Sequence, residues 1–393
     1  MPTPHVVILG AGAAGTAAAR VLKETDAVTV DLVARTAEIP YNRTLMNKAV
    51  VVGLLTSAQA AMTGVHALAD TAEHVDREAR TARLASGRIL PFDALIIATG
   101  SAPRKLEGNI PGARDATDVG LLTALHSLED AVRIRDLLAR QPGPARIVIF
   151  GAGLVAAETA SLLRAQGHQI TLVARSRAPG ATAFGGDIAA RLEASHREHL
   201  ATAFGRTPTA FEVDGAELAI SLDDGSRLQA DIAIVAHGTE ASGPAPWGAG
   251  VGVDERLRTP YPRVYAAGGS AIHHDDMLGT WRIDHWADAV AQGEHAARVL
   301  LHDFELGTDP GRYLPRSPHV AFVHGMTVAA VGMTGAPVSA RVVSQEPLVV
   351  VDEGDVGVVG AAGLDALPDV MEWTHRLHAG ALTSSTRFAP ANG

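Results

Sequence analysis

The sequence contains no cysteine in 393 residues. A chain without cysteine cannot use a disulfide relay, a thiolate nucleophile or an iron–sulfur cluster held by cysteine. Aromatic residues account for only 4% of the chain and charged residues for 19%, and the formal net charge is −10. This acidic balance argues against a general nucleic-acid binder, because neutralising phosphates requires clustered Lys and Arg. We expect no nucleic-acid partner.

Long hydrophobic runs are also absent, and the longest apolar runs have the length of a strand. The opening stretch MPTPHVVILG lacks the basic segment and cleavage site of a secretory signal. We therefore expect a cytoplasmic protein with no membrane partner. The hydrophobic content of 47% and the 40 glycines indicate a globular α/β chain, and its length suggests two or three domains.

The stretch HVVILGAGAAGTAAARVL contains the first of two glycine-rich turns. Its apolar run, His5–Leu9, predicts a buried parallel strand, and Ala13–Glu24 has a helical pattern. The next apolar run, Ala27–Val33, predicts a second strand, so the unit is βαβ.

Gly10, Gly12 and Gly15 give this unit the pattern G-x-G-x-x-G. The first glycine permits a tight turn, the second lets the backbone approach a pyrophosphate, and the third lets helix and strand pack closely. The N–H groups at the start of the helix then face the phosphate. A single such pattern is weak evidence for a dinucleotide site.

The same device returns in RIVIFGAGLVAAETASLL, which starts at Arg146. Gly151 and Gly153 occupy the first two positions, and Ala156 occupies the third, where alanine still permits close packing. Strands are predicted over Arg146–Phe150 and His168–Val173. Two complete units predict two bound dinucleotides.

The acidic residue that binds a ribose in such units is missing from both. Val33-Ala34-Arg35 ends the second strand of the first unit, and Val173-Ala174-Arg175 ends that of the second. Arg175 and Arg177 offer guanidinium groups suited to a 2′-phosphate, which favours NADPH over NADH. The alternative is that both are solvated loop arginines.

Three further stretches follow in order, at Ala37–Val50, Phe92–Arg104 and Arg263–Ala271. With the two turns, they make residues 5–300 resemble the FAD-dependent pyridine nucleotide-disulfide oxidoreductase superfamily, in its ferredoxin-reductase-like branch without a redox disulfide. The resemblance implies an α/β fold with two Rossmann-like FAD- and NAD(P)-binding domains plus a small α+β C-terminal domain. It also implies FAD in the first unit and NADPH or NADH in the second.

The resemblance implies cofactor contacts from both turns, from the strand ends beside them, and from the later motifs. The residues expected at these contacts are Gly10, Gly12, Ala13, Ala14, Gly15, Arg35, Arg43, Lys48, Ala98, Thr99, Gly100, Arg104, Gly151, Gly153, Leu154, Val155, Ala174, Arg175, Arg177, Gly238, Gly268, Gly269 and Trp286. Lys48 and Glu158 are the predicted catalytic residues. The resemblance places Lys48 near flavin N5, paired with Glu158, where a fixed cation stabilises electron density arriving on the ring. A surface Lys and a helix-start Glu are the alternative.

The sequence departs from the family pattern at two polar anchors of FAD. The late motif normally ends in an aspartate that bonds the ribityl chain, but Gly269 stands there, and Ala34 also replaces an acid. Since a hydrogen bond contributes about 1 kcal/mol net, and somewhat more to a charged acceptor, the two losses together would weaken FAD binding by roughly a hundredfold or more unless other groups compensate.

The C-terminal region also departs from the family pattern. SPHVAFVHGMTVAAVG, at Ser317–Gly332, lacks the Trp that relatives place near the flavin, which opens room for a small substrate. The stretch HHDD, at His273–Asp276, is expected to form a loop near the active site without binding metal, because consecutive residues rarely converge on one ion.

We expect a discontinuous FAD domain at residues 1–118 and 246–314, interrupted by an NAD(P)H domain at 119–245. We expect residues 315–393 to form a C-terminal domain with β-rich runs and a helix near Ala366–His378. This domain is expected to cover the flavin or to build a homo-oligomer interface.

The sequence predicts an NAD(P)H-dependent flavin oxidoreductase that passes hydride to FAD N5 and electrons to a ferredoxin-like or Rieske-type partner. One alternative is a flavoenzyme that acts directly on a small organic molecule. A second is a non-catalytic FAD-binding redox sensor, which the retained Lys48 and Glu158 disfavour.

Overall fold

The first glycine turn lies at the end of a five-stranded parallel sheet in the computed structural model, which describes residues 3–35, 40–106, 109–335, 339–355 and 357–379. In order across the sheet, the strands are β19 (Val264–Ala266), β7 (Ala94–Ile97), β1 (His5–Leu9), β2 (Thr29–Ala34) and β3 (Leu68–Ala69). The last four residues of β1 have no solvent exposure. This burial explains the continuous apolar run, because a parallel strand covered on both faces has no polar side.

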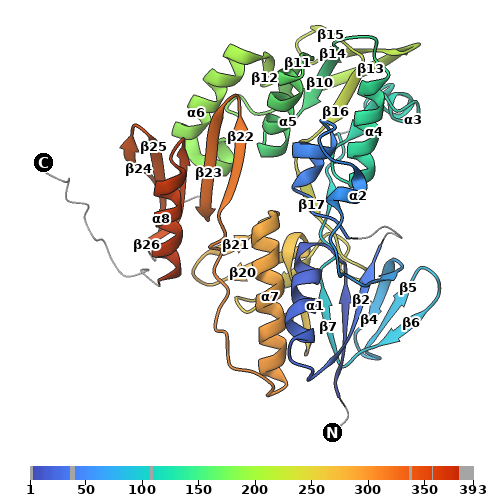
Figure 1. The fold of residues 1–393 in the computed structure, drawn as a ribbon, viewed down its shortest axis with the longest axis vertical. Coiled ribbons are helices and arrows are strands. Elements are labelled where there is room, and N and C mark those ends of the chain that lie inside the picture. Colours follow the sequence, from blue (N-terminus) through green and yellow to red (C-terminus); the bar gives the residue numbers. More distant parts are fainter. Residues whose placement is uncertain (1–2, 36–39, 107–108, 336–338, 356, 380–393) are drawn as a thin grey trace, which may run out of the picture. The chain divides into compact units, whose positions relative to one another are not determined.

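Two helices lie side by side against this sheet, α1 (Ala13–Lys23) and α7 (Trp286–Asp303) (Figure 1). Their backbones approach closely at Gly293, where a Cβ would overlap the carbonyl oxygen of Ala14. The turn before α1 is fixed by a backbone hydrogen bond of 2.8 Å from Gly10 N–H to the carbonyl of Val33. Segments almost 280 residues apart therefore surround the first glycine turn.

The second glycine turn ends the central strand of another five-stranded parallel sheet. Its strands, in order, are β12 (Ala201–Phe204), β11 (Gln169–Ala174), β10 (Arg146–Phe150), β16 (Ile232–Val235) and β9 (Leu122–Ala124). Helices α4 (Leu128–Ala139) and α5 (Leu154–Ala165) pack their apolar residues against it. Both predicted βαβ units are confirmed.

Smaller elements connect and extend the two parallel sheets. The strands are β4 (Ala72–Asp76), β5 (Thr81–Leu84), β6 (Ile89–Pro91), β8 (Ser101–Pro103), β13 (Pro208–Asp214), β14 (Glu217–Leu222), β15 (Arg227–Ala230), β17 (Thr239–Ala241), β18 (Val251–Val253), β20 (Ala271–Asp275) and β21 (Gly279–Trp281). The helical segments are η1 (Met46–Val50), α2 (Ser57–Ala60), α3 (Ala113–Asp118) and η2 (Gly268–Ser270). Strands β8 and β17 form the antiparallel pair that links the two nucleotide-binding regions along the chain.

The chain divides into two compact units, the first comprising residues 1–177 and 196–313 and the second 178–195 and 314–393. The second unit contains an antiparallel sheet and helix α8 (Leu367–His378), close to the helix predicted there. The strands, in order, are β22 (His319–Val323), β23 (Met326–Gly332), β26 (Gly357–Leu364), β25 (Leu348–Gly354) and β24 (Ser339–Gln345). Its core includes Val331, Val351 and Val370, and Trp373 packs against this core.

Helix α6 (Ala181–His199) crosses the boundary between the units and has non-helical backbone at Gly185. The segment up to Ser195 groups with the C-terminal sheet because Phe184 packs against His319 and Arg191 pairs with Glu346. The division into domains at residues 118, 245 and 314 stays a prediction.

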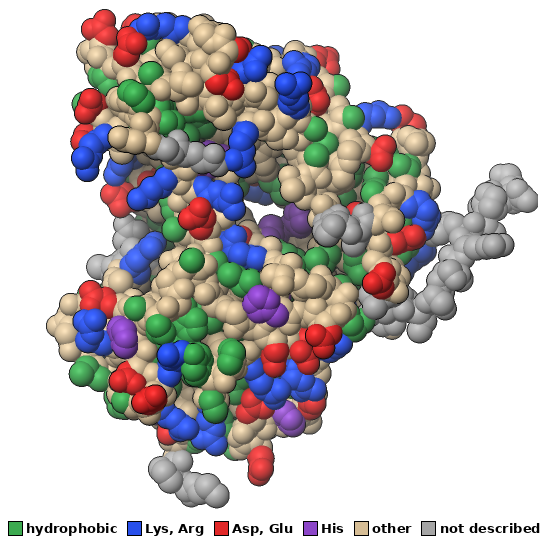
Figure 2. Space-filling view, turned by 180° about the vertical axis from the view of Figure 1, so that it is seen from behind, with side chains coloured by type: hydrophobic (Ala, Val, Ile, Leu, Met, Phe, Trp, Pro, Cys, Tyr) green, Lys and Arg blue, Asp and Glu red, His purple; other side chains and the backbone are tan. Residues whose placement is uncertain are grey.

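Acidic and basic side chains are interspersed over much of the face in Figure 2. Ion pairs account for part of this mixture, among them Arg256 with Asp309 and Arg258 with Asp303. Within the described residues, no helix combines the length and the hydropathy that crossing a bilayer requires.

Candidate active site

The first glycine turn has the shape that a phosphate cradle requires. A Cβ at Gly10 would overlap the carbonyl oxygen of Ala98, and a Cβ at Gly15 would overlap that of Gly10. Gly12, in contrast, is exposed and has no atom within 4 Å of a Cβ built there. It caps α1 without a side-chain hydrogen bond, and the first turn carries no acidic residue. The space before the helix start therefore favours an anion.

Three chain segments gather around this cradle at the carboxyl edge of the first sheet. Ala13 and Ala14 form the first turn of α1, and Ala98, Thr99 and Gly100 follow the end of β7. Gly268 follows β19 and packs on α1, because a Cβ there would lie 3.0 Å from Cβ of Ala14.

Gly269 and Trp286 belong to η2 and α7, two elements that contact each other. Gly269 follows Gly268 in η2, and Trp286 is the first residue of α7. Arg35 is exposed after β2. The fold thus brings together most of the residues predicted to contact FAD, in the place where ligands bind doubly wound sheets.

The second glycine turn repeats this geometry. A Cβ at Gly151 would overlap the carbonyl oxygen of Ala236, whereas Gly153 is exposed with open space before it. Gly153 caps α5 without a side-chain hydrogen bond. Leu154 and Val155 form the first turn, with Val155 44% exposed. The second cradle therefore also fits a phosphate.

Arginines surround the end of β11, after the buried Ala174. Arg175 and Arg177 are exposed, and the stem of Arg177 lies over Gly205, where a Cβ would be 2.9 Å from Cγ of Arg177. Arg206 N–H donates to the carbonyl of Ala174 at 3.0 Å.

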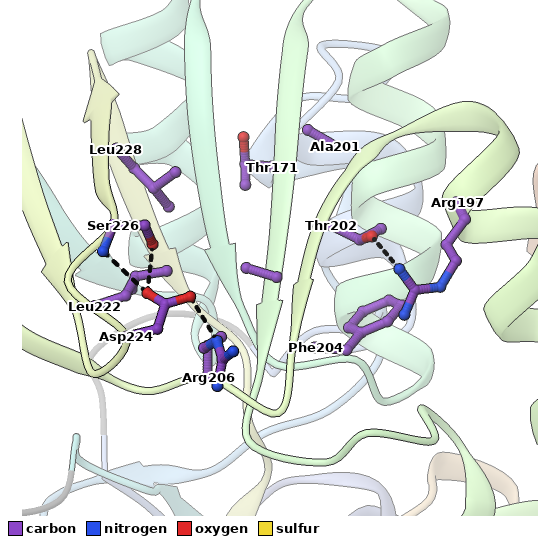
Figure 3. A pocket seen from close by; sticks show the side chains of 11 residues that line it. Thr171, Arg197, Ala201, Thr202, Phe204, Arg206, Leu222, Asp224, Ser226 and Leu228 are labelled. Carbon is purple, nitrogen blue, oxygen red and sulfur yellow. Dashed lines mark hydrogen bonds and ion pairs between the residues drawn. The ribbon is translucent and has the colours of Figure 1, made fainter.

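A pocket of about 360 Å³ lies beside these arginines, between β12 and the small sheet of β14 and β15 (Figure 3). In it the guanidinium of Arg206 pairs with Asp224 at 2.7 Å, and Ser226 Oγ also donates to Asp224. Arg206 is thus paired with Asp224, whereas Arg175 and Arg177 are exposed after the end of β11.

The predicted ion pair is confirmed: Lys48 Nζ lies 3.4 Å from Glu158 Oε1. The Glu158 side chain is 5% exposed and that of Lys48 is 35% exposed. The Asn47 amide donates to the other carboxylate oxygen, Oε2, at 2.7 Å. Both Asn47 and Lys48 belong to the π-helix η1, a rare element that is frequent at functional sites.

Apolar contacts fix this π-helix against the second cradle. Met46 and Val50 are buried in the same core cluster as Ala156 and Ala160 of α5. A loop that follows the first βαβ unit in sequence thus carries Lys48 to the helix of the second glycine turn.

Arg43 is held at the link between the two cradles. Its guanidinium donates to the ring and the carbonyl of His126, and the ring lies 2.9 Å from the carbonyl of Ser101. Burial and the charge of Arg43 lower the pKa of His126 to about 4, so the imidazole is neutral at pH 7 and can accept from Arg43. The contact of Arg43 with flavin stays a prediction.

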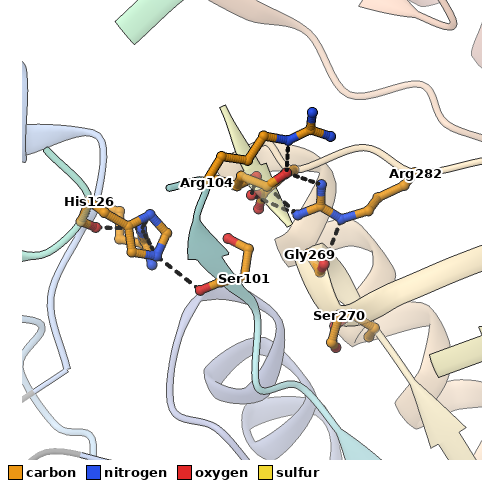
Figure 4. A network of polar contacts seen from close by, with 10 residues as sticks. Ser101, Arg104, His126, Gly269, Ser270 and Arg282 are labelled. Carbon is orange, nitrogen blue, oxygen red and sulfur yellow. Dashed lines mark hydrogen bonds and ion pairs between the residues drawn. The ribbon is translucent and has the colours of Figure 1, made fainter. Parts of the chain in front are cut away.

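The linking strands carry a polar network, shown in Figure 4. Arg104 N–H donates to the carbonyl of Gly238 at 3.1 Å, and its Nε donates to Thr239 at 3.4 Å. Arg282 Nε donates to the carbonyl of Gly269 at 2.7 Å. Arg104 and Gly238, both predicted cofactor contacts, therefore lie side by side where β8 meets β17.

The prediction of a loop at HHDD is wrong, because His273, His274 and Asp275 lie in β20. The ring of His273 stacks on Trp281 across the strand pair, with centroids 3.6 Å apart. Stacking and burial make this histidine part of the core. Within the described part of the chain, no three His, Asp or Glu side chains gather as metal ligands would.

Sequence reasoning missed three residues of this region: Asn47, His126 and Asp284. Asn47 lies within the stretch Ala37–Val50, but its residue type gives no signal for a role. Asp284 stands two residues before Trp286, but its place beside Gly269 depends on contacts that only the fold provides.

The two cradles, joined by the Lys48–Glu158 pair, define an α/β oxidoreductase that binds two dinucleotides. The sequence profile of the pyridine nucleotide-disulphide oxidoreductase family matches residues 4–293. The chain belongs to this family. It does so without a redox disulfide, since it has no cysteine.

Named relatives and solved structures agree with this assignment. The chain is 29% identical over 329 residues to putidaredoxin reductase of Pseudomonas putida, covering 75% of this chain and 74% of the relative. It is 28% identical over 323 residues to the ferredoxin–NAD(+) reductase component of the p-cumate 2,3-dioxygenase system of Pseudomonas putida, covering 75% and 73%. Its fold matches that of the covalent putidaredoxin reductase–putidaredoxin complex with a TM-score of 0.83 at 21% identity, covering 98% of this chain and 96% of that one.

Family and fold confirm the predicted class, an NAD(P)H-dependent flavin oxidoreductase with FAD and NAD(P)H as cofactors. They also confirm the predicted fold class. The residues present fit these cofactors, because each glycine turn leaves an open, uncapped helix start for a pyrophosphate.

Proposed function

We propose that this chain takes electrons from NAD(P)H and delivers them to a ferredoxin-type iron–sulfur protein. In the overall reaction NAD(P)H gives up a hydride, two one-electron acceptors are reduced, and one proton is released. Bound FAD would supply the conversion between a two-electron donor and one-electron acceptors.

The Lys48–Glu158 pair is the observation that carries this proposal. Lys48 follows the first cradle in the chain, whereas Glu158 belongs to the helix of the second. A pair that bridges the two nucleotide regions is suited to the place where two rings exchange electrons. There Lys48 would present its ammonium to developing negative charge, and Glu158, held by Asn47, would keep it in position.

The other named residues hold and orient the two nucleotides. The helix starts at Gly12 and Gly153 would bind the pyrophosphates of FAD and NAD(P)H. Positioning two reactants in this way lowers the barrier by removing their freedom of motion.

The choice of an iron–sulfur partner is supported by the names of the relatives. They are a putidaredoxin reductase and a ferredoxin reductase component of a dioxygenase system. The competing proposal is a small organic electron acceptor. It is based on the C-terminal region, which lacks the Trp of the family pattern and so leaves room for a small molecule near the flavin. Asn47 and Lys48 both contact Glu158, which supports turnover over a sensor that has lost it.

The donor proposed for this chain is NADPH. Arg175 and Arg177 are exposed at the end of β11, where a 2′-phosphate lies in this fold, and no acid stands there to bind a free 2′-hydroxyl. One of the relatives named above is a ferredoxin–NAD(+) reductase component, so NADH is the alternative donor to test. We further propose a cytoplasmic location, because NADPH is available to the enzyme there.

Rapid mixing under anaerobic conditions tests the function. NADPH and NADH are mixed separately with the FAD-loaded protein, and loss of the visible flavin absorption is recorded. A ferredoxin, a Rieske-type protein and a quinone are then offered to the reduced protein. Glu158→Gln should slow flavin reduction, whereas Glu129→Gln, at a 77% exposed side chain, should not.

The outcomes separate the candidates. Fast reduction followed by transfer to the iron–sulfur proteins supports the proposal. Transfer to the quinone alone would favour the small acceptor, and no reduction by either nucleotide would exclude an NAD(P)H-dependent enzyme.

A further inference from the structure

A carboxylate occupies the place that a side chain at position 269 would fill. A Cβ built on Gly269 would overlap Oδ1 of Asp284 and lie 3.0 Å from its Cγ. The next nearest atom is the carbonyl carbon of Gly100, at 3.4 Å. Any residue larger than glycine at position 269 would therefore displace this carboxylate.

The side chains of Thr239 and Arg282 hold Asp284 in this place. Thr239 Oγ1 and Arg282 Nη2 both donate to Oδ2, the latter at 3.0 Å. Arg282 also donates through Nε to the carbonyl of Gly269, so one guanidinium fixes the carboxylate and the backbone next to it (Figure 4).

The carboxylate is ionised and accessible. Burial alone would raise the pKa of Asp284, but hydrogen bonds from Thr239 and Ser101 and the charges of Arg282 and Arg43 outweigh burial and lower it. The side chain remains 30% exposed, so a ligand can still reach it. An ionised carboxylate only accepts hydrogen bonds, so it suits a ligand that carries hydroxyl groups and disfavours a phosphate.

The location of Asp284 connects it with the first cradle. Gly268, next to Gly269, packs against Ala14 in the first turn of α1. Gly100, on the other side, follows Ala98, whose carbonyl contacts Gly10. The carboxylate thus lies at the carboxyl edge of the first sheet, beside the phosphate cradle, where the hydroxyl-bearing part of a dinucleotide would lie.

We infer that Asp284 binds hydroxyl groups of the FAD sugar chain, and that Gly269 is required because it leaves room for this carboxylate. The inference rests on the proposed function, because it assumes FAD in the first cradle. It names a compensating group for the acid missing at position 269. The competing role for Asp284 is structural, as a clamp between η2 and β17.

FAD binding to apoprotein separates these roles without any turnover. FAD is titrated into the full-length apoprotein, and the quenching of its fluorescence gives a Kd. The thermal unfolding of the apoprotein is measured in parallel. The variants are Asp284→Asn, Gly269→Ala, the exchange Gly269→Asp with Asp284→Gly, and the control Asp136→Asn at a half-exposed surface carboxylate in α4.

We expect Asp284→Asn to raise the Kd for FAD about 10- to 100-fold, the range for losing hydrogen bonds to a charged acceptor. Gly269→Ala should raise it as well, since its methyl group displaces the carboxylate without removing it. The exchange variant should bind FAD more tightly than Asp284→Asn, because a carboxylate returns to the same space. Asp136→Asn should bind as the unmodified protein does.

An unchanged Kd in Asp284→Asn, whether or not its apoprotein unfolds at lower temperature, would overturn the inference and leave the proposed function intact. If Asp284→Asn does not fold, Gly269→Ala and the exchange variant decide by the same measurement. Failure of the unmodified apoprotein to bind FAD would instead remove the proposed function itself.

Discussion

At the scale of single residues, Glu158 is contacted on both carboxylate oxygens, by the Asn47 amide at 2.7 Å and by the Lys48 ammonium at 3.4 Å. Asn47 is 5% exposed and Glu158 is 4% exposed, so their hydrogen bond is formed out of water. A carboxylate taken out of water requires such partners. Asn47 is thereby assigned a positioning role for the Lys48–Glu158 pair.

Replacing Asn47 by Leu should lower the free energy of unfolding by about 1.5–3 kcal/mol, the usual contribution of a hydrogen bond to a charged group. Leu keeps the branched shape of Asn but is larger, so overpacking at this buried site adds to the loss. Denaturant unfolding of the apoprotein measures it. In a Glu158→Gln background the loss should shrink, because the acceptor is no longer charged; two losses that simply add would contradict the assignment.

Position 269 shows how a residue-level expectation changes once neighbours are known. From the sequence, glycine in place of the family aspartate predicts weaker FAD binding, since a side chain is missing. The fold places Asp284 in the same space, from a segment 15 residues later in the chain. At Ala34, which is buried at the end of β2, the expectation of a lost acid stays a prediction.

At the scale of elements, α1 and α7 pack so closely that a side chain at Gly293 has no space. A Cβ there would overlap the carbonyl oxygen of Ala14, in the first turn after the phosphate cradle. Because backbone is the obstacle, a rotamer change cannot relieve the clash. The distance between the two helices, and with it the shape of the cradle, depends on this glycine.

Gly293→Ala should therefore destabilise the protein by about 1–3 kcal/mol, the range for overpacking, although alanine alone favours a helix by about 1 kcal/mol. Equilibrium unfolding in guanidinium chloride checks this. Gly143→Ala is the matched control, since its Cβ would point into open space and its φ is not in the left-handed region. An equal response of the two variants would show that helix contact is not the cause.

The elements also show which features sequence can predict. β1 and β10 were predicted with the observed bounds, because continuous apolar runs ending in glycine leave few other structures. The π-helix at Lys48 and the strand at His273 were not predicted, because both depend on tertiary partners. His273 is polar by sequence, but stacking on Trp281 places it in the core.

At the scale of the whole molecule, buried titratable groups give the two units opposite responses to pH. In the first unit, burial lowers the pKa of His126, His196 and His273 to about 4, from a usual value of 6.5. In the second unit, burial raises the pKa of Asp352 to about 6, against a hydrogen bond from the Gly335 amide. The Asp352 contribution to stability is thus present below its unfolded pKa and is lost as pH rises through 6.

For the histidines the sign is reversed. Between pH 4 and 6.5 the unfolded chain binds more protons than the folded chain, so the free energy of unfolding falls as pH falls through this window. Each buried imidazole lowers the free energy of unfolding by up to roughly 3 kcal/mol as the pH falls from 6.5 to 4. Above pH 6.5 both states are neutral, and this contribution is complete.

His273→Phe tests this argument, because phenylalanine keeps an aromatic ring against Trp281 but cannot be protonated. Thermal unfolding of the apoprotein is followed at pH 7 and at pH 5. We expect the melting temperature of the unmodified protein to be lower at pH 5 than at pH 7. The difference should be smaller for His273→Phe. His74→Phe, at an exposed histidine of the same unit, should retain all of it. If both variants keep the full pH dependence, His273 is not a source of the acid sensitivity, and the carboxylates with lowered pKa, such as Asp303, become the better explanation.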